Sequence, residues 1–474
     1  MIIIISVILY FVALTAISRW STKRASNAAF FRGERRSPWW MVAFGMVGAS
    51  ISGVTFVSVP GMVLSSGMTY LQLCMGFILG YVAVAFVLLP VYYKLNLTTI
   101  YSYLGQRLGR KSYLTGAWFF LLSKMAGAAL KFYVVCMIMQ RFVFDSMGVP
   151  FWLTATLLVA LIWLYTRRGG IRTLVFTDVF QTTCLFLALL LIINKVMGQM
   201  DMSMAEVIQN IAADERSRVF VMDDWSSPQN FWKQLLSGMF IVIVMTGLDQ
   251  DMMQKNLTCR TLRDAQKDMC TYGVAFLPAN LLFLALGVML AQLFEASGVA
   301  IPAKGDEMLP LFVSQTGGLV AVLFVIGIMA ASFSSADSAL TSLTTSYCVD
   351  IRDRQDDERL RRRVHIIMCL VFVTFILLFD AVNSKSLIDA IYTIVSYTYG
   401  PLLGLFAFGL FTKRAVRDAF VPYVCVAAPL LCYALDSAAN QLWGYRFGYE
   451  LLLVNGLLTF AGLFALRRKT VSLP

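Results

Sequence analysis

The feature that most constrains this chain is a series of apolar segments, each long enough to cross a lipid bilayer. A helix needs about 20 predominantly apolar residues to span the hydrocarbon core. About thirteen such segments are predicted, at residues 1–18, 39–60, 70–93, 113–141, 150–166, 173–197, 230–252, 270–295, 317–347, 365–380, 387–411, 419–436 and 448–466. The sequence therefore predicts an all-α integral membrane protein, and a composition of 59% hydrophobic and 14% charged residues excludes a soluble enzyme.

The basic residues predict how the chain is oriented. Lysine and arginine outnumber acidic residues by 39 to 27, and they gather in alternate loops such as 32–36, 167–172 and 359–363. The positive-inside rule places these loops in the cytoplasm. We expect a multi-pass protein of the cell membrane with its N-terminus outside and its C-terminus inside. The first segment is expected to remain as a helix, because its basic residues follow the apolar stretch. This pattern makes the lipid bilayer the expected partner and leaves no need for nucleic acid.

The second apolar segment is interrupted by small and hydroxyl-bearing residues. It contains Gly45, Gly48 and Gly53, together with Ser50, Ser52 and Thr55. A helix that unwinds here would turn backbone carbonyls toward a cavity, where they can bind a cation. The alternative is a close contact between helices, since small residues are common at such contacts.

The ninth apolar segment carries hydroxyls and a carboxylate at membrane depth. Ser334, Ser338, Thr341 and Thr345 recur at helical spacing and share one face, and Asp337 lies among them. Each hydroxyl alone can bond to the preceding turn. Together with the carboxylate they favour binding of a hard cation such as sodium, because polar groups inside a membrane are costly.

Three further charged residues are predicted inside the membrane. Asp178 lies near the cytoplasmic edge of its segment, where the alternative role is to reach the membrane interface or to pair with Arg172 or another nearby basic residue. Lys124 and Lys131 share one face of the fourth segment. A buried ammonium needs an anion. The anion for Lys124 is either a substrate carboxylate or a structural partner, Asp178 or Asp337.

Other polar residues are assigned simpler roles. His365, the only histidine, is expected at the membrane interface. Asp249 and Asp251 fall near the cytoplasmic end of the seventh segment, where an exposed or gate-lining role is expected. The loop 198–229 is expected to form a short amphipathic cap. An enzyme is not expected, because there is no HExxH motif and no nucleophile–base pair.

Several short motifs, in this order, resemble the sodium:solute symporter family over nearly the whole chain. They are Ser52-Gly53-Val54-Thr55-Phe56 with Pro60-Gly61, Leu89-Pro90 through Arg107, Gly169-Gly170-Ile171 through Thr177-Asp178-Val179 and Gln181, Gln250 through Lys267, and Gly400-Pro401-Leu402-Leu403-Gly404. The similarity is greatest to members that carry iodide, monocarboxylates, vitamins or sialic acid.

The resemblance implies a LeuT-like fold in a single membrane domain, 1–474. Two inverted repeats of five helices form the core at 39–411. One helix and a cytoplasmic loop precede it (1–38), and two helices with a short tail follow it (412–474). In such folds the ion and solute lie at discontinuous helices near the middle of the membrane.

The resemblance also implies two cation sites. The family's shared sodium site corresponds to the carbonyls of Gly48, Ile51 and Ala331 and the hydroxyls of Ser334 and Ser335. A second sodium site found in some members corresponds to Asp178, Ser334, Asp337 and Ser338, with Asp337 in place of a hydroxyl. Two adjacent carboxylates repel unless a cation or proton lies between them. Sodium or the ammonium of Lys124 would meet that need.

The function implied is sodium-coupled import of a small organic solute, for which the protein needs sodium and no other cofactor. An organic anion such as a monocarboxylate or sialic acid is favoured, because the positions of two sugar-binding residues of the family hold Val242 and Phe276. Alternatives are a sodium/sugar or other neutral-solute symporter, a proton-coupled transporter, and a membrane sensor on the same fold, which is disfavoured because no kinase-like segment is present. A monomer suffices. The candidate substrate residues are Ser50, Ser52, Thr55, Gln72, Lys124, Lys131 and Thr398.

Overall fold

The computed structural model describes residues 2–21, 26–225, 227–382, 387–445, 447–448 and 450–468. Across these residues the chain is almost entirely helical, and the two short strands β1 (Ala415–Val416) and β2 (Arg467–Arg468) pair antiparallel. Five cations counted in the charge pattern lie outside the described residues: Lys23, Arg24, Lys385, Arg446 and Lys469.

Helices lie within every predicted apolar segment. They are α1 (Ile2–Ser21), α3 (Trp39–Ser50), α4 (Gly53–Gly61), α6 (Tyr70–Ala83), α7 (Leu89–Lys94), α9 (Arg110–Met139), α10 (Phe151–Thr166), α11 (Ile171–Met200), α13 (Phe231–Val242), α14 (Gln250–Asn256), α15 (Leu262–Ala296), α17 (Gly318–Ser346), α18 (Glu358–Val382), α19 (Leu387–Phe411), α20 (Val421–Trp443) and α21 (Leu451–Ala465). Short helices connect them: α2 (Asn27–Arg32), α5 (Val63–Ser66), α8 (Ser102–Arg107), α12 (Met204–Ala213) and α16 (Met308–Thr316).

Length and composition set a lower bound on the number of membrane spans. In the described part of the chain, 8 helices are long and apolar enough to cross a membrane, or up to 9 if the bent pair Phe231–Gly247 and Gln250–Asn256 forms one span. Broken or shorter apolar helices, among them α3, α10 and α21, fall below that length criterion. The prediction of a multi-pass helical membrane protein is thus confirmed, whereas the count of thirteen spans stays a prediction.

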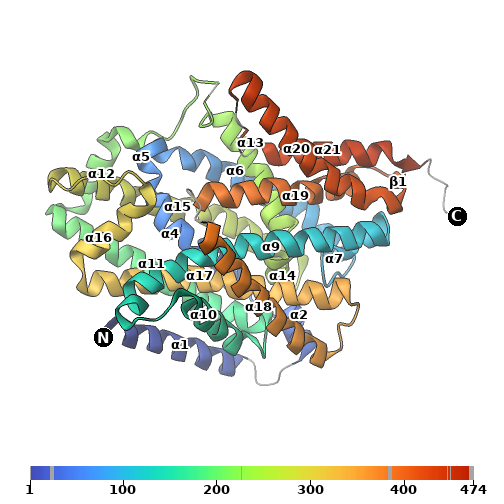
Figure 1. Ribbon diagram of the computed structural model, residues 1–474, viewed down its shortest axis with the longest axis horizontal. Helices are drawn as coiled ribbons and strands as arrows, with labels where there is room; N and C mark the ends of the chain where they lie inside the picture. The colour runs from blue at the N-terminus through green and yellow to red at the C-terminus, as the bar shows by residue number, and fades with distance from the viewer. Residues whose placement is uncertain are drawn as a thin grey trace.

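The bundle is organised around α17 and its neighbours. Helices α9, α11 and α17 run along the long axis through the middle of the molecule, with α1, α10 and α18 on one side and α20 and α21 on the opposite side (Figure 1). Helix α17 packs against α3, α9 and α11. Its hydroxyl stripe, including Thr341 and Thr345, is therefore buried inside the protein and does not face lipid.

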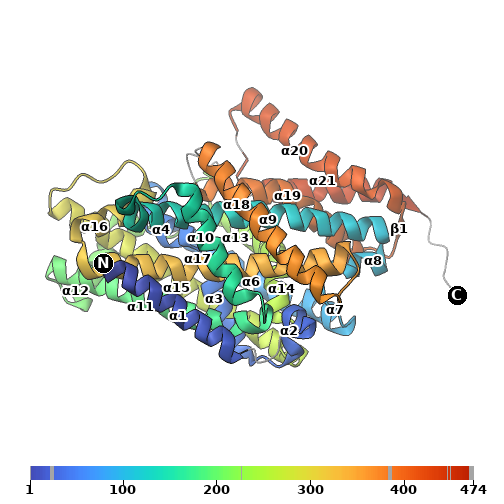
Figure 2. The same ribbon diagram turned by 60° about the horizontal axis from the view of Figure 1, so that its bottom comes forward.

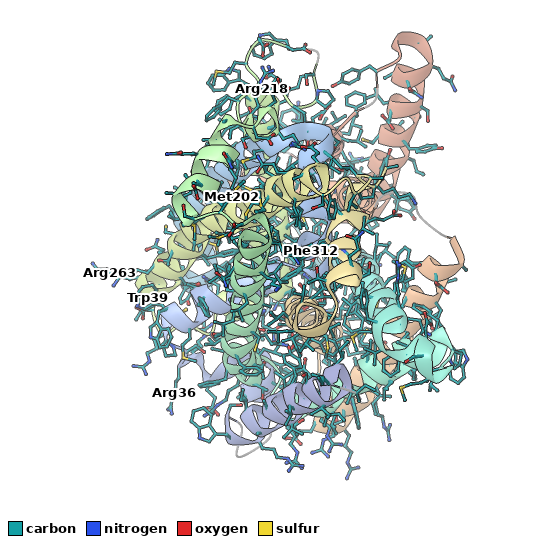
Figure 3. The ribbon with its side chains drawn as sticks, turned by 90° about the vertical axis from the view of Figure 1, so that its left-hand side faces the viewer. Arg36, Trp39, Met202, Arg218, Arg263 and Phe312 are labelled. Atoms are coloured by element: carbon teal, nitrogen blue, oxygen red, sulfur yellow. The ribbon has the colours of Figure 1, made fainter. Side chains whose placement is uncertain are left out.

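The two ends of the bundle differ in the elements that cover them. Helices α12 and α16 lie at the end where α1 begins, and β1 lies at the other end (Figure 1). Figure 3 looks at the first end and labels Met202, which precedes α12, and Phe312 of α16. Helix α12 begins with a capping box of Ser203 and Glu206, so the predicted amphipathic cap is confirmed as a helix.

An ion pair ties this cap to the bundle. Arg216 contacts Asp214 at 2.7 Å and Glu295, at the end of α15, at 2.8 Å. The hydrogen bonds that Arg216 donates lower the pKa of Asp214 to about 2. Asp214 therefore stays ionised, and its pair with Arg216 intact, at any physiological pH.

Close packing of α6 and α13 depends on glycine. A Cβ atom added at Gly238 would lie 2.3 Å from the carbonyl oxygen of Leu73. Gly238→Ala is expected to destabilise the protein by about 1–3 kcal/mol, because the backbones must separate to admit the methyl group. Thermal unfolding of the purified protein measures this. The control is Gly198→Ala in α11, where a Cβ meets nothing within 4 Å. Equal midpoints for the two variants would contradict the packing described.

Candidate functional site

The predicted break in the second apolar segment is present. Helix α3 ends at Ser50, Ile51 is extended with φ −79° and ψ 93°, and α4 begins at Gly53. Among the described residues, the carbonyl oxygens of Gly48 and Ile51 accept no backbone hydrogen bond. Two carbonyl oxygens are thus free to bind a cation at the break.

Small residues at this break also allow close packing. A Cβ atom at Gly48 would lie 1.9 Å from Thr182 Oγ1 of α11, and one at Gly53 would lie 2.2 Å from Ser332 Oγ of α17. In the part of the chain that the structure describes, both hydroxyl oxygens are buried and have no hydrogen-bond partner. The second apolar segment therefore has both predicted features, an unwound stretch and close contacts with neighbouring helices.

Two adjacent hydroxyls of α17 contact different helices. Ser335 Oγ donates to the carbonyl oxygen of Ala49, at 2.5 Å, and Ser334 Oγ donates to Asp178 Oδ1, at 2.7 Å. Ala331, one turn earlier on α17, is fully buried. The neutral oxygens predicted to bind sodium thus lie where α3 and α17 meet, next to a carboxylate of α11.

The carboxylate of Asp178 already has a cationic partner. Lys255 Nζ of α14 lies 2.7 Å from Asp178 Oδ2, with side-chain exposures of 2% and 1%. Asp337 instead accepts hydrogen bonds from neutral groups, Tyr165 Oη at 2.8 Å and Ser338 Oγ at 3.3 Å. The structure places no lysine or arginine of its described residues within 4.0 Å of Asp337.

The pairing considered for Lys124 is wrong. Lys124 Nζ lies 3.1 Å from Asp249 Oδ2 and 2.6 Å from Asp251 Oδ2, and it pairs with neither Asp178 nor Asp337. Lys255 is the ammonium beside Asp178. The sequence spacing did not determine which lysine lies beside Asp178. Lys255 takes that place because α14 enters the protein interior.

A second break brings the two aspartates inside. Helix α13 continues as a π-helical turn to Gly247, and the chain then bends by 71° into α14. The Asp249 side chain caps α14 by accepting from the backbone N–H of Asp251, at 2.8 Å. Asp249 also accepts from Tyr399 Oη of α19, at 2.6 Å. Both aspartates are buried, so the expectation of an exposed position was wrong, whereas the gate-lining role stays a prediction; both side chains line the cavity described next.

A cavity of about 140 Å³, lined by apolar side chains together with hydroxyl-bearing and charged ones, lies between the two broken helices. Of the candidate substrate residues, five line it: Ser50, Ser52, Thr55, Lys124 and Lys131. Ser335, of the predicted sodium set, also lines it. Its wall includes residues that the sequence did not single out as candidates, chiefly Tyr81, Tyr272 and Tyr399. Ser50 Oγ hydrogen-bonds to Tyr272 Oη.

Two candidates lie away from this cavity. Gln72 is fully buried, donates to the carbonyl oxygen of Gln229 at 2.9 Å and accepts from the backbone N–H of Val221 at 3.2 Å. It therefore ties α6 to the loop before α13. Thr398 of α19 is likewise not part of the cavity wall.

Lys131 is the cavity's unpaired cation. It follows Lys124 by two turns of α9, about 10 Å along the axis. Unlike Lys124, it forms no ion pair within 4.0 Å among the residues that the structure describes. An anionic group in the cavity can therefore contact Lys131 without displacing a carboxylate.

A helical membrane bundle with two broken helices around a cavity that holds charged side chains has the architecture of a secondary transporter. The model of the sodium:solute symporter family matches residues 30–421. The chain belongs to the sodium:solute symporter family, and it is a multi-pass membrane transporter coupled to sodium.

Curated relatives and solved structures agree with this placement. The chain is 25% identical to the sodium/sialic acid symporter NanT of Aliivibrio fischeri over 96% of this chain and 92% of that protein. It is 23% identical to the human sodium/iodide cotransporter, covering 81% of this chain and 61% of that one. A substrate-bound, outward-open structure of a sodium-coupled sialic acid symporter has the same fold, with a TM-score of 0.83 over 99% of both chains at 21% identity.

Proposed function

We propose that this symporter imports a small organic anion, such as a monocarboxylate or a sialic acid, together with sodium. The observation that carries the proposal is the position of Ser335. Its hydroxyl contacts the carbonyl of Ala49 at the α3 break and also lines the cavity that contains Lys131. A sodium ion held at Ser335 would thus lie beside the bound solute, so each would favour binding of the other.

The sodium ligands in this proposal are the carbonyls of Gly48, Ile51 and Ala331 and the hydroxyls of Ser334 and Ser335. All are neutral oxygens, the type of ligand that suits a hard cation released once per transport cycle. Sodium binding from outside stabilises the outward-open state, solute binds next, and the bundle then opens inward. Sodium must therefore bind the outward state more tightly than the inward state.

The proposed topology has thirteen membrane helices in a LeuT-like arrangement within one domain, 1–474. The first repeat runs from α3 to α11 and the second from α13 to α19, with α1 before and α20 and α21 after. Each repeat then begins with a broken helix, α3–α4 and α13–α14, which supports the assignment. The N-terminus lies outside and the C-terminus inside, and a monomer is sufficient.

Proton coupling is a second candidate, supported by one feature. Asp337 is fully buried, and its partners Tyr165 and Ser338 are neutral, as a carboxyl that gains and loses a proton would require. Asp178, by contrast, is held by Lys255. Solute uptake driven by a pH gradient without sodium would favour this alternative.

A ligand screen tests the proposed solute class. Thermal unfolding of the purified full chain is measured in sodium and in potassium, with sugars, amino acids, monocarboxylates and sialic acids. We expect an organic anion to raise the unfolding temperature in sodium and not in potassium. A neutral sugar as the sole stabilising solute, or equal effects in the two salts, would contradict the proposal.

Lys131→Met provides a residue-level check. The substitution is expected to weaken anion binding about 10- to 100-fold, because a hydrogen bond to a charged group contributes about 1.5–3 kcal/mol. The measurement is a titration of the solute found in the screen. Lys195→Met, at an exposed position of α11, is the matched control and should leave the affinity unchanged. Unchanged affinity in Lys131→Met would remove Lys131 from the site.

A further inference from the structure

A second cavity, which shares no lining residue with the solute cavity, lies between the end of α10 and the start of α18. Its volume is about 380 Å³. Arginines dominate its wall, Arg167 and Arg168 after α10 and Arg361 and Arg362 in α18, and no acidic side chain of the described residues lines it. The transport mechanism uses none of these residues.

Arg361 is the most unusual member of this arginine cavity. It is 1% exposed, and its three guanidinium nitrogens have no hydrogen-bond partner among the described residues. Its guanidinium carbon lies 4.7 Å from the ring centroid of Phe30. A cation–π contact offsets only part of the cost of burying an unpaired charge. The guanidinium therefore requires an anion that the protein itself does not provide.

The neighbouring side chains leave Arg361 available. Glu358 pairs with Arg362, at 3.1 Å and largely exposed. His365, expected at the membrane interface, is instead buried and bridges α10 and α17, with Thr166 and Thr344 each 2.9 Å from a ring nitrogen. The floor of the arginine cavity is thus fixed by helix-to-helix bonds, and Arg361 remains free to bind a ligand.

The position of the arginine cavity favours a lipid phosphate. Figure 2 shows α10 and α18 at the outer surface of the bundle. Exposed apolar residues lead away from the cavity along both helices, Leu164 on α10 and Ile366 and Leu370 on α18. Acyl chains can lie along these residues while a phosphate group contacts the arginines. Basic pockets at the cytoplasmic side of transmembrane helices commonly bind acidic headgroups.

We propose that the arginine cavity binds a phosphate group, supplied by the headgroup of an anionic phospholipid. Arg361 forms charge-assisted hydrogen bonds to the phosphate oxygens, and Arg167 and Arg168 add positive charge at the entrance. Arg167 is positioned by stacking on Trp163, with its guanidinium carbon 4.8 Å from that ring. The bound lipid connects α10 to α18, so it also stabilises this edge of the bundle.

The test compares sources of phosphate on the purified full chain. One arm measures unfolding in nanodiscs of phosphatidylcholine with and without phosphatidylglycerol. The other adds inorganic phosphate to protein in detergent, with the chloride salt of the same cation at matched ionic strength as the control. Bound lipid is counted by native mass spectrometry. Arg361→Gln is the main variant, and Arg167→Gln with Arg168→Gln is the second, at exposed positions that should fold normally. Arg363→Gln, exposed on α18 and outside the cavity, is the control.

We expect phosphatidylglycerol to bind and stabilise the wild type, with affinity falling about fivefold for each arginine removed. Arg363→Gln should behave as the wild type. Stabilisation by inorganic phosphate, with no additional effect of phosphatidylglycerol, would retain the phosphate site and assign it to a soluble ligand. The proposal is overturned if neither source stabilises the protein, or if both cavity variants bind lipid as well as Arg363→Gln does.

Discussion

Replacing Lys255 by methionine is expected to destabilise the protein by about 3–5 kcal/mol, because it leaves Asp178 as a buried charge without its partner. The ion pair is 2.7 Å long and both side chains are almost completely buried. The pair also joins α14, the second half of the broken helix α13–α14, to α11. Loss of the pair therefore affects the region around the proposed sodium site. Thermal unfolding of the purified variant in detergent measures the effect.

The double variant Lys255→Met, Asp178→Asn separates the charge effect from packing. It removes both charges and is expected to recover most of the lost stability, since replacing a whole buried ion pair is often nearly neutral. Sodium provides a further readout. It should stabilise Lys255→Met more than the double variant, because a sodium ion can take the place of the ammonium beside Asp178. Equal stability of Lys255→Met and the wild type would show that the pair does not hold α14 in place.

Ser335→Ala is expected to weaken sodium activation about 10- to 100-fold, by analogy with the loss of one hydrogen bond to a charged group. The change removes a hydroxyl of α17 that contacts the α3 break and also lines the solute cavity. Ser334→Ala is expected to act in the same direction, although it also removes a hydrogen bond to Asp178. The measurement is the sodium concentration that gives half-maximal solute uptake.

Ser342→Ala is the matched control for these two variants. Ser342 lies on the same helix, is buried, and donates to the carbonyl oxygen of Ala339 in its own helix. Its removal should leave sodium activation unchanged. If Ser334→Ala and Ser335→Ala also show unchanged activation at normal expression, the sodium site does not lie on α17.

The sequence predicted the parts of this site that depend on local chemistry. A glycine-rich run with hydroxyls predicted the break between Gly48 and Gly53, because glycine in a helix interior costs about 1 kcal/mol relative to alanine. Regular spacing predicted the buried polar face of α17. Both features depend on residues near one another in the chain, so periodicity and composition were enough to detect them.

The partners of the buried charges were not predictable in the same way. Lys124 pairs with residues more than a hundred positions away, and the choice among several aspartates depends on how the helices pack. The apolar segment 230–252 predicts one continuous span, with Asp249 and Asp251 near its end. Gly247 followed by the helix-capping Asp249 was the available indication of a bend there. Lys255 follows the predicted segment 230–252, where the sequence indicates a loop, so its burial beside Asp178 could not be predicted.

Equilibrium binding of radiolabelled sodium to the purified full chain tests the central claim most directly, because it requires no knowledge of the solute. The account predicts saturable binding that excess unlabelled sodium displaces and potassium does not, and that Ser335→Ala greatly weakens while Ser342→Ala does not. Absence of saturable sodium binding, or equal displacement by potassium, would contradict the account.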